Sequence, residues 1–164
     1  MYWFASTKNT TIPHTIYVES RLHVRLYLSE GTTLICPGIY VDKGSTLTIE
    51  GEGALIADAT GAVSNDDPNG EGYSAGIGGG GTIIIKGGDI TAKGGFNGAG
   101  IGGDELLTGS GTSGYSGDIR ISGGVVNASG GASGAGIGGG TSGTGGTITI
   151  SGGVVTARGG IYGI

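Results

Sequence analysis

Two short acidic clusters are the residues of this 164-residue chain best suited to chemistry. Asp66, Asp67 and Glu71 lie close together in one segment, and Asp104 is followed by Glu105 in another. Clustered carboxylates suit calcium, and a carboxylate beside a sugar can act as a general base. The simpler interpretation is solvated charge on loops, because unpaired acids are common there. Both interpretations are kept, and no catalytic residue is assigned.

Two tyrosines, Tyr73 and Tyr115, occur in the same segments as the acids. An exposed aromatic ring can stack on the face of a sugar, although either ring could equally cover the end of a core strand. We expect no cofactor, with calcium as the alternative. His14 and His23 are expected to face outward from strands, and no metal site is assigned to them. The predicted glycan or calcium contacts are Asp66, Asp67, Glu71, Tyr73, Asp104, Glu105 and Tyr115.

Three other motifs in the chain have ordinary explanations. The pattern Gly-x-Gly-x-x-Gly begins at Gly76, Gly98 and Gly134, but strand-like sequence follows each copy, whereas a dinucleotide site needs a helix there. Ser74 lies in Gly-x-Ser-x-Gly, a pattern that serves catalysis only on a strand-to-helix turn with a histidine partner. Cys36, the single cysteine, shares the parity of the apolar residues around it, which predicts a buried thiol.

The elements that position these residues repeat along the sequence. Copies of one strand-Gly-Gly phrase start at Thr82, Asp118 and Thr147, and a degenerate copy starts at Thr46, so the spacings are 36, 36 and 29 residues. A second strand phrase and then an Ala-Gly-Ile-Gly-Gly phrase follow in each repeat. Periods of this length indicate a solenoid or a similar array.

The phrases predict a particular kind of solenoid. Each has strand length with apolar residues two apart, and glycine pairs supply the sharp corners. We therefore predict an all-β, right-handed parallel β-helix with three short strands per coil and about five coils. The predicted core columns contain Ile83, Ile85, Ile119, Ile121, Ile148 and Ile150 on the first face, and Ile101 and Ile137 on the third.

Composition bounds the partners and the organisation of the chain. The net charge is −5 with no basic stripe, so nucleic acid is a poor partner, and no apolar run reaches the roughly 20 residues of a membrane helix. Of the 42 glycines, three fall in the first 50 residues. Residues 1–45 are therefore predicted as an N-terminal cap with the first coil or coils, and 46–164 as glycine-rich repeats, divided into 46–81, 82–117, 118–146 and an incomplete 147–164.

The order of phrases resembles the glycine-rich repeats of bacterial secreted and cell-surface proteins. The resemblance rests on the strand-Gly-Gly phrases, on Ala-Gly-Ile-Gly-Gly-Gly, and on the lead-in from Leu28 to Leu34 and from Ile39 to Ile49. Such proteins are often described as carbohydrate-binding-domain-containing, and their fold is similar to the pectate-lyase-like β-helix. The resemblance covers roughly residues 24–164 and implies an extracellular or cell-surface location; it indicates architecture more than function.

Three functions follow as expectations. The first is a non-catalytic extracellular β-helix module, a rigid scaffold or adhesin that binds polysaccharide. The second is a structural subunit that stacks end to end with neighbouring copies into an extracellular filament, because no polar capping segment is visible at Ile164. The third, a minor alternative, is a calcium-dependent polyuronate lyase.

Overall fold

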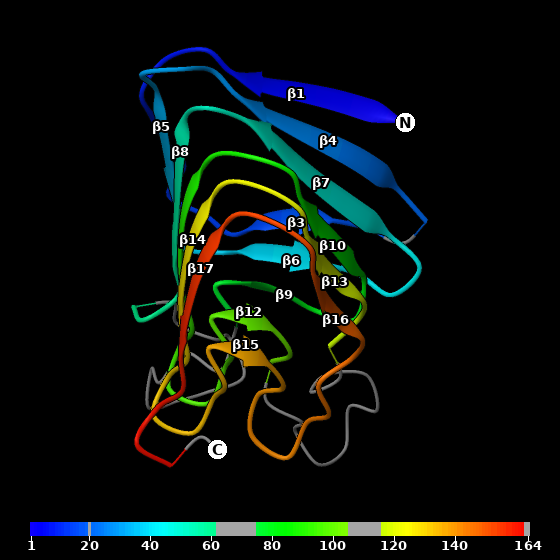
Figure 1. The fold of residues 1–164 in the computed structure, drawn as a ribbon, viewed down its shortest axis with the longest axis vertical. Coiled ribbons are helices and arrows are strands. Elements are labelled where there is room, and N and C mark those ends of the chain that lie inside the picture. Colours follow the sequence, from blue (N-terminus) through cyan, green and yellow to red (C-terminus); the bar gives the residue numbers. More distant parts are fainter. Residues whose placement is uncertain (20, 62–74, 105–115, 163–164) are drawn as a thin grey trace.

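The protein folds as a stack of coils built only from strands. The computed structural model describes residues 1–19, 21–61, 75–104 and 116–162. Within these residues the secondary structure consists of strands, without helices, and the strands form three parallel sheets (Figure 1). Each complete coil gives one strand to each sheet. The chain is therefore a right-handed parallel β-helix of five complete coils and a partial sixth, which confirms the predicted fold class.

The strands fall into three sheets that we call A, B and C. Sheet A has the order β1 (Tyr2–Ser6), β4 (His23–Leu28), β7 (Thr46–Gly51), β10 (Thr82–Ile85), β13 (Ile119–Ile121) and β16 (Ile148–Ile150). Sheet B contains β2 (Thr10–Thr11), β5 (Thr33–Cys36), β8 (Ala54–Asp58), β11 (Asp89–Lys93), β14 (Val125–Ser129) and β17 (Val154–Arg158). Sheet C contains β3 (Ile16–Val18), β6 (Ile39–Val41), β9 (Ile77–Gly78), β12 (Ile101–Gly102) and β15 (Ile137–Gly138).

The strand register stacks like residues in columns through the core. Alternate residues of a strand point inward, so identical spacing in each repeat places apolar side chains directly above one another. On sheet A the columns are Leu47, Ile83, Ile119 and Ile148, and Ile49, Ile85, Ile121 and Ile150. On sheet B they are Leu55, Ile90, Val126 and Val155, beside Ala57, Ala92, Ala128 and Ala157. On sheet C they include Ile77, Ile101 and Ile137.

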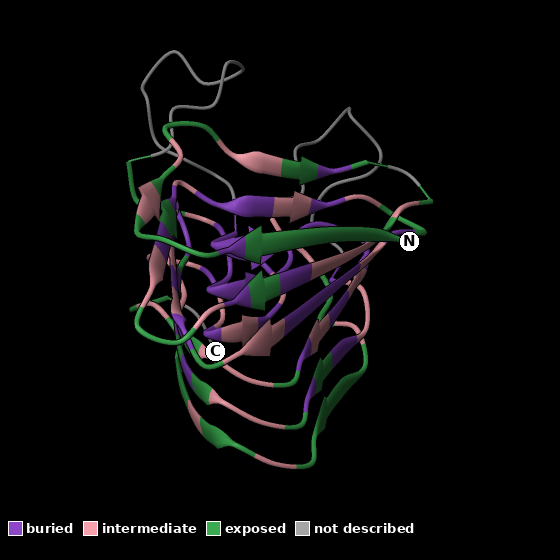
Figure 2. Cartoon of the chain, turned by 90° about the horizontal axis from the view of Figure 1, so that it is seen from above, coloured by how far each residue is buried: buried purple, intermediate pink, exposed green. Residues whose placement is uncertain are grey.

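Burial is complete in the middle of the stack and is lost at its ends. Ile83, Ile85 and Ile119 have no exposed surface, whereas Ile148 and Ile150 keep the inward register but are 41% and 51% exposed. The cause is that no further described coil covers the last one. Figure 2 shows the same contrast, with an exposed first strand β1 and an exposed last coil on either side of buried strands.

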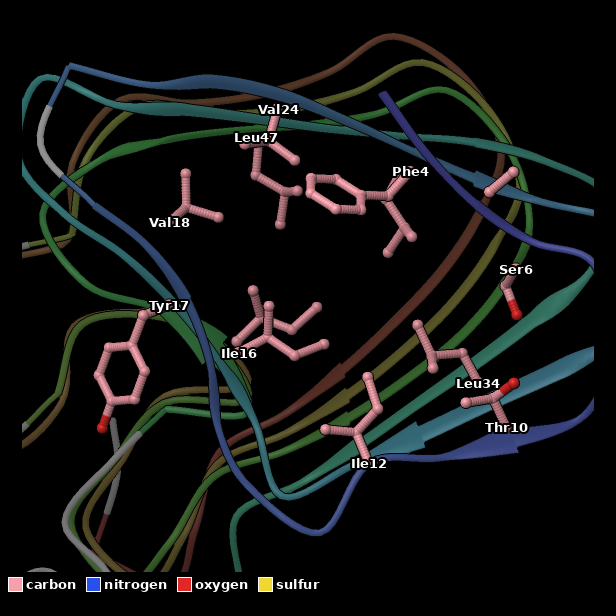
Figure 3. Close-up of a pocket in the computed structure, with 13 residues that line it drawn as sticks. Phe4, Ser6, Thr10, Ile12, Ile16, Tyr17, Val18, Val24, Leu34 and Leu47 are labelled. Atoms are coloured by element: carbon pink, nitrogen blue, oxygen red, sulfur yellow. The ribbon is translucent and has the colours of Figure 1, made fainter. Parts of the chain in front are cut away.

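The core also changes width along the stack. In the glycine-rich coils, small residues such as Ala75 and Ala99 let the sheet C wall approach the other two sheets. The first coils instead enclose larger side chains, and the open end of the first coil contains a cavity of about 330 Å³ (Figure 3). Phe4, Ile16 and Val18 point into this cavity. The described cavity thus lies at the first-coil end of the core, not among the glycine-rich coils.

Glycine allows the coils to approach closely along sheet C. Gly102 has a φ of +136°, and a Cβ atom at this residue would lie 1.9 Å from the carbonyl oxygen of Gly138 in the next coil. The corresponding Cβ at Gly78 would lie 2.2 Å from the carbonyl oxygen of Gly102. A side chain at Gly102 would thus both strain the backbone and separate two hydrogen-bonded strands.

Replacing Gly102 tests this packing. We expect Gly102→Ala to lower the free energy of unfolding by more than about 2 kcal/mol, because the new methyl group meets backbone that cannot move away. The control is Gly61→Ala, since a Cβ at Gly61 has nothing within 4 Å and that variant should stay within about 0.5 kcal/mol of wild type. Urea unfolding followed by circular dichroism measures both, and equal stabilities of the two variants would contradict the packing argument.

Candidate ligand-binding surface on sheet C

One of the seven predicted contact residues, Asp104, lies in the part of the chain that the structure describes. The other six fall outside the described residues: Asp66, Asp67, Glu71, Tyr73, Glu105 and Tyr115. Asp104 lies shortly after β12, which ends at Gly102. Its Oδ1 accepts a hydrogen bond from the backbone N–H of Ala75 at 2.5 Å. This bond joins the side chain to the segment that leads into β9.

The carboxyl group of Asp104 lies in a poorly solvated position. Burial raises its pKa to about 6 from the ordinary 3.8, and the hydrogen bond from Ala75 opposes this shift because it favours the charged form. A carboxyl group with such a pKa changes its charge near neutral pH. It can accept hydrogen bonds above that pH and also donate one below it.

Two tyrosines that sequence reasoning did not single out lie side by side on the outer face of sheet C. Tyr17 of β3 and Tyr40 of β6 are register neighbours, with ring centroids 5.8 Å apart and planes tilted by 47°. Tyr17 is 67% exposed. Figure 3 shows its ring outside the coil while Ile16 and Val18 point inward. The pair is therefore a surface feature rather than part of the core.

The column of sheet C that contains Tyr40 continues as glycine in the later coils. The register places Gly78 next to Tyr40, and then Gly102 and Gly138 in the following coils. These three glycines are buried, and a Cβ at Gly78 or Gly102 would lie against the backbone of the next coil. The tyrosine pair is therefore the part of this column that is open to solvent.

Asp104 and the tyrosines belong to the same local group. A small cavity of about 30 Å³ is lined by Thr15, Tyr17, Tyr40 and Asp104, together with Gly38, Ile39 and Ala75. Burial, and then the negative charges of Asp104 and Asp42, raise the pKa of the Tyr40 phenol, which keeps this hydroxyl protonated as a hydrogen-bond donor. We call Tyr17, Tyr40, Asp104 and Thr15 the sheet C patch. It combines ring faces with hydroxyl groups and a carboxylate.

The sequence held a signal for the tyrosines that reasoning from repeats passed over. Residues 16–18 and 39–41 share the pattern Ile-Tyr-Val, which places a tyrosine on the outer face between two inward residues. The two copies are 23 residues apart, a spacing that differs from the later repeats. Comparing them would have predicted the aromatic pair.

Other reactive groups in the described residues do not assemble into a centre. No group of three or more His, Cys, Asp or Glu residues that could hold a metal ion occurs there. His14 and His23 are both exposed. Cys36 is buried and unpaired, and burial raises the pKa of its thiol to about 11, so it stays protonated and is a poor nucleophile. Within the same residues, no helix is long and apolar enough to span a membrane.

Comparison with known proteins supports the architecture. A family model described as the β-helix repeat matches residues 83–105, 119–141 and 148–164, one segment in each of the last three coils. No curated protein and no solved structure matched the chain.

The raised pKa of Asp104 predicts how stability depends on pH. Between about pH 4 and pH 6 the folded state holds a proton that the unfolded state has released, so the free energy of unfolding should fall as pH rises through this range. The shift corresponds to a loss of about 2 kcal/mol between pH 4 and pH 7. Asp104→Asn keeps an oxygen for Ala75 but cannot ionise.

The measurement is urea unfolding of the wild type and Asp104→Asn at pH 4 and pH 7. Subtracting the variant removes the contribution of the other carboxyl groups. The wild type should lose stability relative to the variant on going to pH 7, and a difference that does not change with pH would show that Asp104 titrates normally.

Proposed function

We propose that this β-helix repeat protein is a non-catalytic extracellular or cell-surface module. It is a rigid scaffold that binds polysaccharide on the sheet C patch. The observation that carries the proposal is the outward Tyr17–Tyr40 pair, with a 67% exposed ring and the Asp104 carboxyl group beside it.

The chemistry of the patch suits a sugar chain. A tyrosine ring stacks on the apolar face of a sugar while its hydroxyl group stays in water. The carboxylate of Asp104 accepts hydrogen bonds from sugar hydroxyl groups, and such charge-assisted bonds are stronger than neutral ones.

The shape of the patch favours binding without reaction. A polysaccharide can cross an open face of a sheet without threading an end into a closed site. Catalysis by contrast relies on a site that excludes water and fixes the reacting atoms, and the cavity beside Asp104 holds about 30 Å³, roughly one water molecule. We therefore assign Asp104 a binding role.

Tyr17→Ala tests the patch with little risk to the fold, because the ring is mostly exposed. We expect it to weaken binding to the polysaccharide by about tenfold, the loss of one stacking contact. Affinity electrophoresis through gels that contain β-glucan, xylan or mannan, each with and without calcium, measures this. The matched control is Tyr162→Ala, which removes an exposed tyrosine from the opposite end of the coils. If no polysaccharide retards the wild type, or if both variants bind like the wild type, the proposal is wrong.

End-to-end association is a second candidate function, favoured by the two exposed ends of the stack. At one end an apolar cavity opens beside Phe4, and at the other Ile148 and Ile150 are about half exposed. Strands β1 and β16 are the two edge strands of sheet A, so each has one side without a partner among the described residues. Edge strands and apolar ends are the features through which β-proteins add further strands.

Sedimentation velocity over a wide range of protein concentrations tests this association. We expect species larger than the monomer to increase with concentration, and Ile150→Glu to abolish them because a charge cannot be buried unpaired at the contact. Thr149→Glu, which places the same charge on the outer face, is the matched control. Concentration-independent monomer for the wild type would exclude end-to-end stacking of this chain.

A further inference from the structure

A second surface, on the outer face of sheet A, gathers cations on an acidic protein. A groove of about 180 Å³ is lined by His23, Arg25 and Lys86 together with Thr46 and Thr48. His23 and Lys86 are exposed, Arg25 and Thr46 are half-buried and Thr48 is 9% exposed. The threonines therefore form the floor, and His23 forms the rim together with the cations Arg25 and Lys86.

The strand register accounts for this arrangement. His23 and Arg25 of β4 are paired with Thr46 and Thr48 of β7, so short side chains lie directly beside long ones. Lys86 follows β10, and its backbone N–H donates to the carbonyl oxygen of Ile49 in β7. Lys86 therefore lies on the opposite side of β7 from β4. The groove thus runs across three coils, with a low middle strand between two raised borders.

Neighbouring acids balance the charge in the groove only in part. Glu50 is paired with Arg25 at 2.7 Å, and this is the one ion pair at the groove. His23 and Lys86 have no ion-pair partner among the described residues. The net charge of the chain is −5, so a local excess of positive charge is a departure from its average surface. Such an excess, above two threonine hydroxyl groups, suits a single oxyanion.

An aromatic surface borders the same groove. The guanidinium carbon of Arg25 lies 4.9 Å from the centre of the Trp3 ring. The rings of Trp3 and Tyr27 are 6.4 Å apart and within 23° of parallel, and Trp3 is 57% exposed. The two exposed rings form an aromatic border next to the cations. Arg25 belongs to both, since it stacks on Trp3 and lines the groove.

We propose that this groove and its aromatic border bind an anionic saccharide, with a sulfate ester or carboxylate held by Lys86, Arg25 and the threonine hydroxyl groups. The sugar ring that carries the anionic group stacks on Trp3. A saccharide fits better than a nucleic acid, because the groove offers one anion site whereas a nucleic acid brings a charge with every phosphate to a protein of net charge −5. The site is separate from the sheet C patch, so it stands or falls independently of the polysaccharide proposal made there.

The test uses three polymers with one backbone, namely dextran, carboxymethyl-dextran and dextran sulfate, and polyglutamate as an anionic polymer without sugar rings. Trp3 is the only tryptophan of the chain, so its fluorescence and its quenching by acrylamide report on this surface directly. We expect a charged dextran to protect Trp3 from quenching at low salt, and neutral dextran at equal concentration to give no protection. Whether the sulfated or the carboxymethylated polymer binds more tightly identifies the preferred anion.

Lys86→Gln removes one rim cation and leaves no acid unpaired among the described residues. We expect it to weaken binding of the charged dextran by about tenfold, the loss of one charge-assisted contact. Arg158→Gln is the matched control, because it makes the same change of charge at an exposed residue of β17, in the last coil. Unchanged urea unfolding curves establish that both variants are folded.

Four results would overturn the proposal. They are equal protection of Trp3 by neutral dextran, no protection by either charged dextran, an equal loss of affinity in Lys86→Gln and Arg158→Gln, and equal protection by polyglutamate. The first removes the role of charge and the second removes the site. The third replaces a defined site with diffuse attraction, and the fourth shows that the sugar ring contributes nothing.

Discussion

The stacking of one backbone directly on another is the constraint on which the rest of this molecule depends. Every strand is hydrogen-bonded to the same strand of the neighbouring coil, so the chain must turn its corners at one fixed height per coil. A Cβ at Gly131 would lie 1.7 Å from the carbonyl oxygen of Gly95, and one at Gly160 would lie 1.8 Å from that of Gly131. Corners stacked this closely exclude side chains, which explains why glycine is so abundant after residue 50.

The same constraint separates the chemistry from the shaft. In the later coils, sheet C strands are two residues long, and glycine takes the register position of Tyr40, as at Gly102 and Gly138. The first two coils have three-residue strands in this sheet, and the outward position holds Tyr17 and Tyr40. Aromatic side chains on sheets A and C therefore gather where the coils are wider, and the glycine-rich coils act as a uniform support.

Repetition made the core predictable and hid the surface. Ile83, Ile119 and Ile148 could be aligned from their phrases alone, because each phrase has the same parity and the same glycine pair after it. Trp3, Tyr17 and Tyr40 precede the first clear phrase, and their coils are 22 or 23 residues long, as Tyr2 to Val24 and Val24 to Leu47 indicate. The phrases that align the later coils therefore do not reach these rings, and the shorter Ile-Tyr-Val repeat is the signal that places Tyr17 and Tyr40.

Asp104 illustrates what a column cannot predict. Its sequence neighbours indicate a solvated loop, yet its carboxyl group is held against Ala75, a residue of the preceding coil. Stacking also brings it to the same small cavity as Tyr40, which is two coils away in the order β6, β9, β12. A repeat describes each coil by itself and its contacts with an identical neighbour. The properties of Asp104 and of the Arg25–Trp3 contact arise where neighbouring coils differ, and these are the places where a solenoid can acquire a binding site.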